Sequence, residues 1–236
     1  MIAPGSGILN LACADLDARP LFWTDDNGLR YGYEPEVALA VADSLGLELK
    51  WKFLQWSDFV PALLEGRVDA IWCGCAITPE REQQFLFSRP YAVFNESLLV
   101  SAGSKVRSEA DVAGLRIGAI SGSTNMTLAQ TWDGCEPVGF DGQTDDVFAD
   151  MINALANGEI DGVVDDEPAF GGVLADQRFR LAFTVETRNA WGAALRPGHE
   201  GLKQELDQAL DELIDSGKIR TIWERNLAGI PYPGLQ

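Results

Sequence analysis

The sequence has little histidine, few cysteines and no long apolar run, and each shortage excludes a class of protein. The only histidine is His199, so the sequence offers almost no residues for histidine-based catalysis or for a histidine-rich metal site. The four cysteines, at positions 13, 73, 75 and 135, follow neither a zinc pattern nor the redox Cys-x-x-Cys spacing. No apolar run approaches the roughly 20 residues that span a bilayer. We therefore expect no catalytic residue, metal or cofactor, and we interpret the cysteines as small buried hydrophobes.

Basic residues are also scarce. The chain has 18 lysines and arginines against 36 aspartates and glutamates, which gives a formal net charge of −18. A nucleic-acid partner is not expected, because this charge repels a phosphate backbone, and adhesion to anionic lipid is disfavoured for the same reason. The charge is spread along the whole chain, as on a solubility surface. Its field favours a cationic ligand only weakly once salt screens it.

The opening segment MIAPGSGILN lacks the basic start and the long apolar core of a signal peptide. Two interpretations stay open at this point. The protein is either cytoplasmic, or exported with its leader segment already removed.

Strand and helix patterns alternate over the first hundred residues. The predicted elements are strands over 7–15, 47–54 and 68–77 and helices over 34–46 and 57–67. The second helix is expected to begin on Ser57 as its N-cap. The apolar run 68–77 predicts one continuous strand, as in a parallel sheet covered on both faces. This order favours an open sheet with crossover helices.

A similar pattern returns in the second half of the chain. The predicted elements are a strand over 115–123, a helix over 144–159, a buried strand over 160–170 that carries acids, and a helical end over 201–227 with a break at Gly217. The segment ALLEGRVDAIWC resembles the segment ALANGEIDGVVDD, which lies about 90 residues further along the chain. Such internal similarity indicates a repeated structural unit. Two lobes of similar build are therefore expected.

Polar residues follow three predicted strands, where open α/β sheets bind ligands. These residues are Asp15 and Asp17, Thr78 and Arg81, and Asp166 and Glu167. A helix is expected to start at residues 78–81 and another at Ser123–Thr124, where backbone N–H groups suit an anion, and an arginine fork suits a carboxylate. Each residue also has a plain structural interpretation, as a surface ion pair or a cap.

Taken together, Arg81, the Ser123–Thr124 turn and Asp166 have the chemistry to hold a zwitterion. Trp56 stands at another strand-to-helix junction, where its ring is placed either to stack on a ligand or to pack half-buried against the protein.

Four stretches resemble the periplasmic solute-binding proteins of family 3, which deliver polar amino acids to ABC transporters. They are 56–91, 115–125, 158–168 and 217–226, in the order of the family. The resemblance implies an α/β, two-lobed periplasmic-binding-protein type II fold. Each lobe would be an open, mostly parallel sheet flanked by helices, and two hinge strands would join the lobes.

The same resemblance implies a division of the chain and a set of partners. Residues 1–95 and 192–236 would form the first lobe, and residues 96–191 the second. The partners would be an amino acid or related amine and the membrane permease of an ABC transporter. The protein would be a monomer in the periplasm or outside the cell, with a lipid tether possible.

Carried over position by position, the resemblance assigns roles to single residues. Arg81 would bind the ligand α-carboxylate with the backbone N–H of Thr124, and Asp166 would bind the α-amino group with the Gly74 carbonyl. Trp56 would stack on the ligand side chain, and Asp15 would face its far end. The ligand is therefore expected to be cationic or polar.

The sequence departs from the family pattern at three places. Ala76 replaces a serine or threonine whose hydroxyl helps to hold the amino group, Ala18 replaces a frequent aromatic, and GYEPEV replaces the usual Gly-Phe-Asp-x-Asp. The missing hydroxyl is worth about 1 kcal/mol and leaves a roomier pocket. The alternative function is a cyclohexadienyl or arogenate dehydratase on the same fold, with Glu167 as a general acid.

Overall fold

The computed structural model describes residues 7–235. The MIAPGS segment, which carries most of the expectation about a leader, lies outside these residues. The chain divides into two compact units. Unit 1 comprises the described residues up to Asp15, Leu21–Val93, and the described residues from Asn189 onward, whereas unit 2 comprises Leu16–Pro20 and Phe94–Arg188.

The sheet of unit 1 combines segments from both ends of the chain. Its strand order is β4 (Glu48–Phe53), β1 (Ile8–Cys13), β5 (Ala70–Ile71), β12 (Ala194–Leu195) and β6 (Leu86–Phe87). Strands β4, β1 and β5 run parallel, whereas β12 is antiparallel to both of its neighbours. The sheet is therefore mixed, because the chain returns to it through β12 after passing through unit 2.

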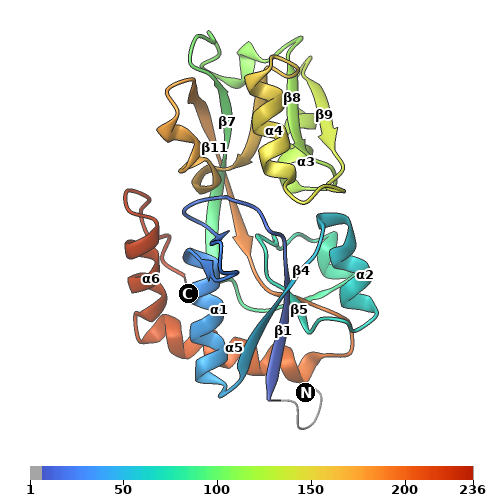
Figure 1. Cartoon of the computed structure of the whole chain (residues 1–236), viewed down its shortest axis with the longest axis vertical. Coiled ribbons are helices and arrows are strands. Elements are labelled where there is room, and N and C mark those ends of the chain that lie inside the picture. Colours follow the sequence, from blue (N-terminus) through green and yellow to red (C-terminus); the bar gives the residue numbers. More distant parts are fainter. Residues whose placement is uncertain (1–6, 236) are drawn as a thin grey trace. The chain divides into compact units, whose positions relative to one another are not determined.

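Four helices and a small hairpin complete unit 1. The helices are α1 (Tyr33–Ser44), α2 (Phe59–Leu64), α5 (Glu200–Asp215) and α6 (Lys218–Asn226), and the hairpin joins β2 (Trp23–Thr24) to β3 (Arg30–Tyr31). Helix α1 packs on β4, α5 and α6, and α2 packs on β1 and β5 (Figure 1). Short 3₁₀ turns cover Trp56–Asp58 and Arg81–Gln83.

Two details of the predicted elements are wrong. Ser57 is not the N-cap of the second helix, because it lies inside the 3₁₀ turn and Asp58 precedes α2. The strand predicted over 68–77 ends at Ile71, because Gly74 takes φ 62° and turns the chain out of the extended conformation. The breaks at Gly46 and Gly217 are confirmed, with φ 66° and 74°.

Unit 2 is built around a second mixed sheet. Its order is β11 (Phe179–Trp191), β7 (Ala92–Ser101), β10 (Gly162–Asp166), β8 (Arg116–Ile120) and β9 (Glu136–Phe140). Strands β10, β8 and β9 run parallel, and β7 is antiparallel to β10. The helices are α3 (Thr124–Thr131) and α4 (Val147–Ala156), with 3₁₀ turns over Glu109–Asp111, Glu167–Phe170 and Val173–Ala175. Buried Leu98, Ile117, Trp132 and Val164 lie in one core cluster.

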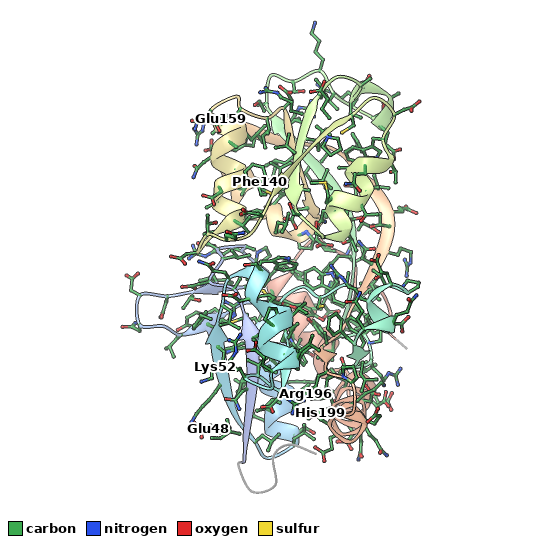
Figure 2. The ribbon with its side chains drawn as sticks, turned by 90° about the vertical axis from the view of Figure 1, so that its right-hand side faces the viewer. Glu48, Lys52, Phe140, Glu159, Arg196 and His199 are labelled. Atoms are coloured by element: carbon green, nitrogen blue, oxygen red, sulfur yellow. The ribbon has the colours of Figure 1, made fainter. Side chains whose placement is uncertain are left out.

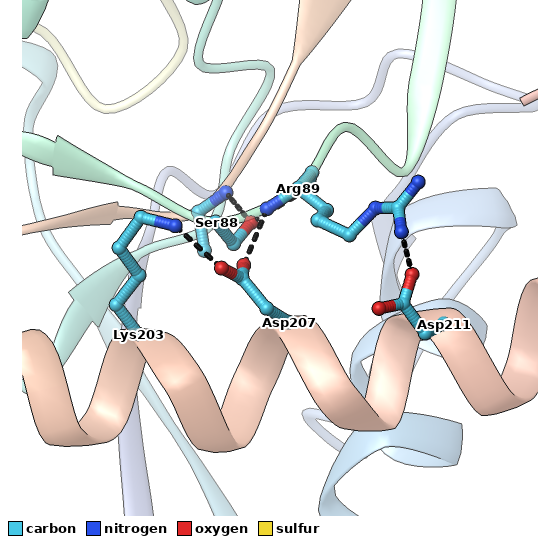
Figure 3. Close-up of polar contacts among 6 residues, drawn as sticks. Ser88, Arg89, Lys203, Asp207 and Asp211 are labelled. Atoms are coloured by element: carbon cyan, nitrogen blue, oxygen red, sulfur yellow. Dashed lines mark hydrogen bonds and ion pairs between the residues drawn. The ribbon is translucent and has the colours of Figure 1, made fainter. Parts of the chain in front are cut away.

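The chain crosses between the units on both sides of Leu16–Pro20, and its two strand passages lie within β7 and within β11. At the unit 1 end of these passages, Ser88 N–H donates to the Ala193 carbonyl at 2.9 Å, and Ala193 N–H donates to Ser88 Oγ at 2.9 Å. Helix α5 contacts the same region. Asp207 accepts from Arg89 N–H through Oδ1 at 2.6 Å and pairs with Lys203 through Oδ2, and Asp211 pairs with the Arg89 guanidinium (Figure 3). These bonds fix the ends of the two passages to each other and to α5.

Candidate ligand-binding site

The carboxyl edge of the unit 1 sheet carries the first group of predicted site residues. Because β4, β1 and β5 are parallel and in register, the segments that follow them leave the sheet at one edge. Asp15 follows β1 and is exposed, whereas Trp56 follows β4 and is half-buried. The Trp56 ring lies 5.3 Å from the ring of Phe59, between centroids. Gly74, Ala76 and Arg81 follow β5 at the same edge.

The segment that carries Gly74 and Ala76 is held against the end of β11. Ile77 N–H donates to the Ala190 carbonyl at 2.8 Å, and Gly192 N–H donates to the Cys75 carbonyl at 3.1 Å. A Cβ at Gly74 would come within 3.3 Å of the Trp191 ring, so the ring and the positive φ both favour glycine there. The position of the Gly74 carbonyl is therefore set by packing as well as by the turn.

Arg81 begins a 3₁₀ turn, whereas the sequence predicted the start of a helix. Its N–H donates to Thr78 Oγ1 at 3.2 Å, and its Nη1 donates to the Ala76 carbonyl at 3.0 Å. A single turn has little macrodipole, because the dipole grows with the number of aligned peptides. Attraction for an anion at this place therefore comes from the guanidinium itself.

Unit 2 presents a second group at the carboxyl edge of its parallel strands. Ser123 is the N-cap of α3, where its Oγ accepts from Met126 N–H at 3.0 Å and donates to the Ile120 carbonyl at 2.7 Å. The first N–H groups of a helix, including that of Thr124, have no partner within the helix and suit an anion. Asp166 ends the neighbouring strand β10 and is 7% exposed.

Two acids and an amide beside Asp166 were not predicted from the sequence. Glu96 stands opposite Asp166 in the antiparallel ladder, and its Oε1 accepts from Asn125 Nδ2 at 3.0 Å. Asp165 Oδ1 accepts from Asp166 N–H at 2.7 Å. Burial raises the pKa of Asp165 to about 7, and the charge of Glu96 adds to the shift. In the sequence, the one signal for Glu96 is that it is an acid within the apolar run VFNESLLV.

Glu34 is a further polar residue that the sequence did not assign to the site. It lies in the first turn of α1 and is 1% exposed. Its Oε1 accepts from Gly74 N–H at 2.9 Å and from the Tyr91 hydroxyl at 2.5 Å. Burial raises the pKa of Glu34, and these two hydrogen bonds oppose the shift. GYEPEV was identified only as a departure from the family pattern, although Glu34 contacts a predicted site residue.

All four cysteines are free thiols, and burial raises the pKa of Cys13 to about 12. His199 accepts a hydrogen bond from Arg196 Nε at 2.6 Å, and burial and the Arg196 charge lower its pKa (Figure 2). Within residues 7–235, no group of three or more histidine, cysteine or acidic side chains is placed to hold a metal. No helix in that range is long and apolar enough to cross a membrane.

Comparison with known proteins gives consistent matches over nearly the whole chain. A family model described as "Bacterial extracellular solute-binding proteins, family 3" matches residues 11–228. The L-cystine-binding protein TcyJ of Escherichia coli (strain K12) is 28% identical over 210 residues, which cover 87% of this chain and 77% of that protein.

Solved structures give the same picture. An ancestral arginine-binding protein bound to arginine has a TM-score of 0.85 at 25% identity, covering 94% of this chain and 99% of that one. The ancestral amino acid-binding protein AncCDT-1, described as a precursor of cyclohexadienyl dehydratase, has a TM-score of 0.80 at 23% identity, covering 93% and 95%, and this likeness supports the fold alone. The predicted periplasmic-binding-protein type II fold is confirmed, with mixed sheets in both units.

Proposed function

Because the chain belongs to the bacterial extracellular solute-binding proteins, family 3, we propose that it captures an amino acid between its two units for uptake by an ABC transporter. The transporter's membrane permease is its partner in this proposal. The protein acts as a monomer in the periplasm or outside the cell. Capture leaves the ligand chemically unchanged.

One observation carries this proposal: complementary charges stand at the carboxyl edges of two separate sheets. Arg81 in unit 1 suits an α-carboxylate, which its planar fork binds with two parallel hydrogen bonds. Asp166 in unit 2 suits an α-ammonium group. A zwitterion satisfies both only if the units close over it, and the two chain passages within β7 and β11 are the hinge in this proposal.

Small-angle scattering tests this closure directly. We expect the radius of gyration to fall when the protein is saturated with a ligand confirmed by calorimetry, because closing a hinge brings the units together. Arg81→Ala measured in the same ligand solution is the control and is expected to keep the larger radius. If a saturating ligand leaves the wild-type profile unchanged, ligand-driven closure is wrong.

The ligand side chain is proposed to be cationic or strongly polar. Asp15 is exposed in the structure, so a ligand that covers it must offer a hydrogen-bond donor or leave a buried charge unsatisfied. The Trp56 ring offers a face for a cation or a planar group. The arginine-bound and cystine-binding relatives fit this ligand class, since both names refer to polar amino acids.

A competition panel tests the side-chain preference and the role of Asp15. We expect lysine, arginine, ornithine or glutamine to bind more tightly than leucine or glutamate. Asp15→Asn should weaken binding of a cationic ligand about tenfold, equivalent to about 1.4 kcal/mol, because it removes one charge from the pair. Asp43→Asn, an exposed acid of the same unit near the end of α1, is the control and should change nothing. The prediction fails if leucine or glutamate ranks first, or if Asp15→Asn preserves the ranking.

Dehydration of a cyclohexadienyl acid is the alternative that needs a direct assay. It requires a carboxyl group with a raised pKa, and burial raises the pKa of the strand acid Asp165 to about 7, although the sequence pointed to Glu167 for this role. Incubation with prephenate and with arogenate should give no aromatic product above the background of Asp165→Asn. Product formed by the wild type alone would contradict binding without turnover.

A further inference from the structure

Glu34 is the buried acid in contact with the proposed amino-group subsite of unit 1. Its Oε1 accepts from the N–H of Gly74 at 2.9 Å, and the carbonyl of the same residue is the group proposed to bind the ligand's ammonium. The Tyr91 hydroxyl donates to the same oxygen at 2.5 Å, and the Tyr91 ring stacks on Trp72 at 4.5 Å between centroids. Glu34 therefore fixes the position of the Gly74 N–H, and its own carboxylate is held by two donors, the Gly74 N–H and the Tyr91 hydroxyl.

The second carboxyl oxygen, Oε2, is buried and has no hydrogen-bond partner among the described residues. A carboxylate that is 1% exposed is costly unless both oxygens are satisfied or a positive charge lies close by. Ala76 in the same segment has no side-chain oxygen, so it offers no acceptor to an ammonium group. An acid with one unsatisfied oxygen therefore contacts a segment whose side chains at these positions offer no acceptor.

We propose that Glu34 is a positioning residue and a second acid of the amino-group subsite. It holds Gly74 with Oε1, and the negative charge of its carboxylate attracts the ligand's ammonium in place of the missing hydroxyl at Ala76. This inference rests on the proposed function, and it specifies that the ligand carries a primary ammonium group.

The surroundings of Glu34 make this charge dependent on pH. The groups that face it are Arg30 of β3, Cys13 of β1, Cys73 and Cys75 after β5, and Tyr91 before β7. Burial raises the pKa of Glu34, while Tyr91, Gly74 and the Arg30 charge oppose the shift. A bound ammonium stabilises the charged carboxylate, so binding lowers this pKa and releases a proton. Affinity is therefore expected to rise as pH rises through the pKa of Glu34.

Glu34→Gln removes the negative charge of the side chain and keeps its shape, so it tests the role of the charge alone. The amide oxygen can still accept from Gly74 and Tyr91, but the negative charge is lost. We expect the affinity for L-arginine or L-glutamine to fall about tenfold. Binding of the matching analogues without the α-amino group, 5-guanidinopentanoate and glutaramate, should stay within about twofold of wild type, because they have no ammonium to lose. Asp69→Asn, an acid of the same unit that precedes β5 and accepts from Asn10 N–H at 2.8 Å, is the matched control.

Calorimetry of the wild type supplies a test that needs no variant. In pairs of buffers of different ionisation enthalpy, compared over a range of pH, L-arginine or L-glutamine should bind with net proton release around the raised pKa of Glu34, and Glu34→Gln should reduce that release. If Glu34→Gln does not fold, Glu34→Asp is used, and it should keep part of the release while binding more weakly, because the shorter acid retreats from Gly74.

The outcomes distinguish failure of this inference from failure of the proposed function on which it rests. Equal weakening of the amino acid and of its analogue assigns Glu34 a purely structural role and overturns the inference. Wild-type affinity in Glu34→Gln, or no proton release by the wild type, also overturns it while leaving amino-acid capture intact. If neither amino acid nor any other member of the panel binds to the wild type, the proposed function fails, and this inference fails with it.

Discussion

Arg81→Ala should abolish ligand binding and leave the fold intact. The guanidinium is the group proposed to bind the α-carboxylate with two charge-assisted hydrogen bonds, and losing it costs about 3 kcal/mol or more, which is over a hundredfold in affinity. The fold should survive because the backbone of the turn keeps its bonds, such as Phe85 N–H to the Arg81 carbonyl at 2.9 Å. Calorimetry with the tightest ligand of the panel and a thermal melt of the free protein measure the two effects.

Two further variants define the cause of the loss. Arg81→Lys keeps the charge but not the fork, so its affinity should fall between those of wild type and Arg81→Ala. Arg67→Ala removes an arginine from an exposed pair with Glu65 in the same unit, and its affinity should match wild type. Near-native affinity in Arg81→Ala would remove Arg81 from the proposed site.

Trp223→Ala should give the largest loss of stability in unit 1. The side chain is 0% exposed on α6, and its ring meets Tyr33 and Tyr232 edge-on at 5.2 and 5.7 Å between centroids. Its Nε1 also donates to the Ile230 carbonyl at 2.8 Å. Truncation leaves a large cavity and an unsatisfied carbonyl, and we expect a loss of about 3–5 kcal/mol in the free energy of unfolding.

Denaturant unfolding followed by circular dichroism measures this loss. Trp223→Phe keeps most of the ring volume and loses the hydrogen bond, so its effect should be smaller, about 1–2 kcal/mol. Leu39→Ala, on the exposed side of α1 with 50% of the residue accessible, is the control and should change stability by less than about 0.5 kcal/mol. A loss below about 1 kcal/mol in Trp223→Ala would show that the cluster around α6 is not a main support of unit 1.

The sequence predicted the elements whose signals are local. The first helix ends where Gly46 takes a positive φ, and the last helical segment breaks at Gly217 for the same reason. Ser123 is the N-cap of α3, as a Gly-Ser-Thr turn before a helix indicates. Each of these depends on a backbone preference of one residue and its immediate neighbours, which periodicity and turn chemistry can reveal.

Features that depend on distant partners were not predictable in the same way. The two residues of β12 form a strand because β5 and β6 flank them, and nothing in the pair Ala194–Leu195 distinguishes it from a loop. The run 68–77 looks like one strand because its side chains are apolar, yet only Ala70–Ile71 are strand, Gly74 bends the chain and Ala76 forms an isolated bridge with Trp191.

The candidate site shows the same division. Asp15 and Arg81 were assigned to strand ends, and Trp56 to a strand-to-helix junction, from the order of strands and helices, whereas Gly74 came from the family resemblance alone. The parallel register of β4, β1 and β5 brings the segments that carry these residues to one edge. Glu34 was missed because its role depends on a contact 40 positions along the chain with the N–H of Gly74. A buried carboxylate in a helix reads as an ordinary surface acid until its partners are known.

The place of β12 between β5 and β6 also sets an order of events during synthesis. A ribosome releases β1, β4, β5 and β6 early, but their sheet stays incomplete until the chain beyond Asn189 has emerged. Most of unit 2 is one continuous segment, Phe94–Arg188, so its strands meet while the nascent chain is still growing. The middle of the polypeptide, although made later, can therefore be native before the segment that carries β1, β4, β5 and β6.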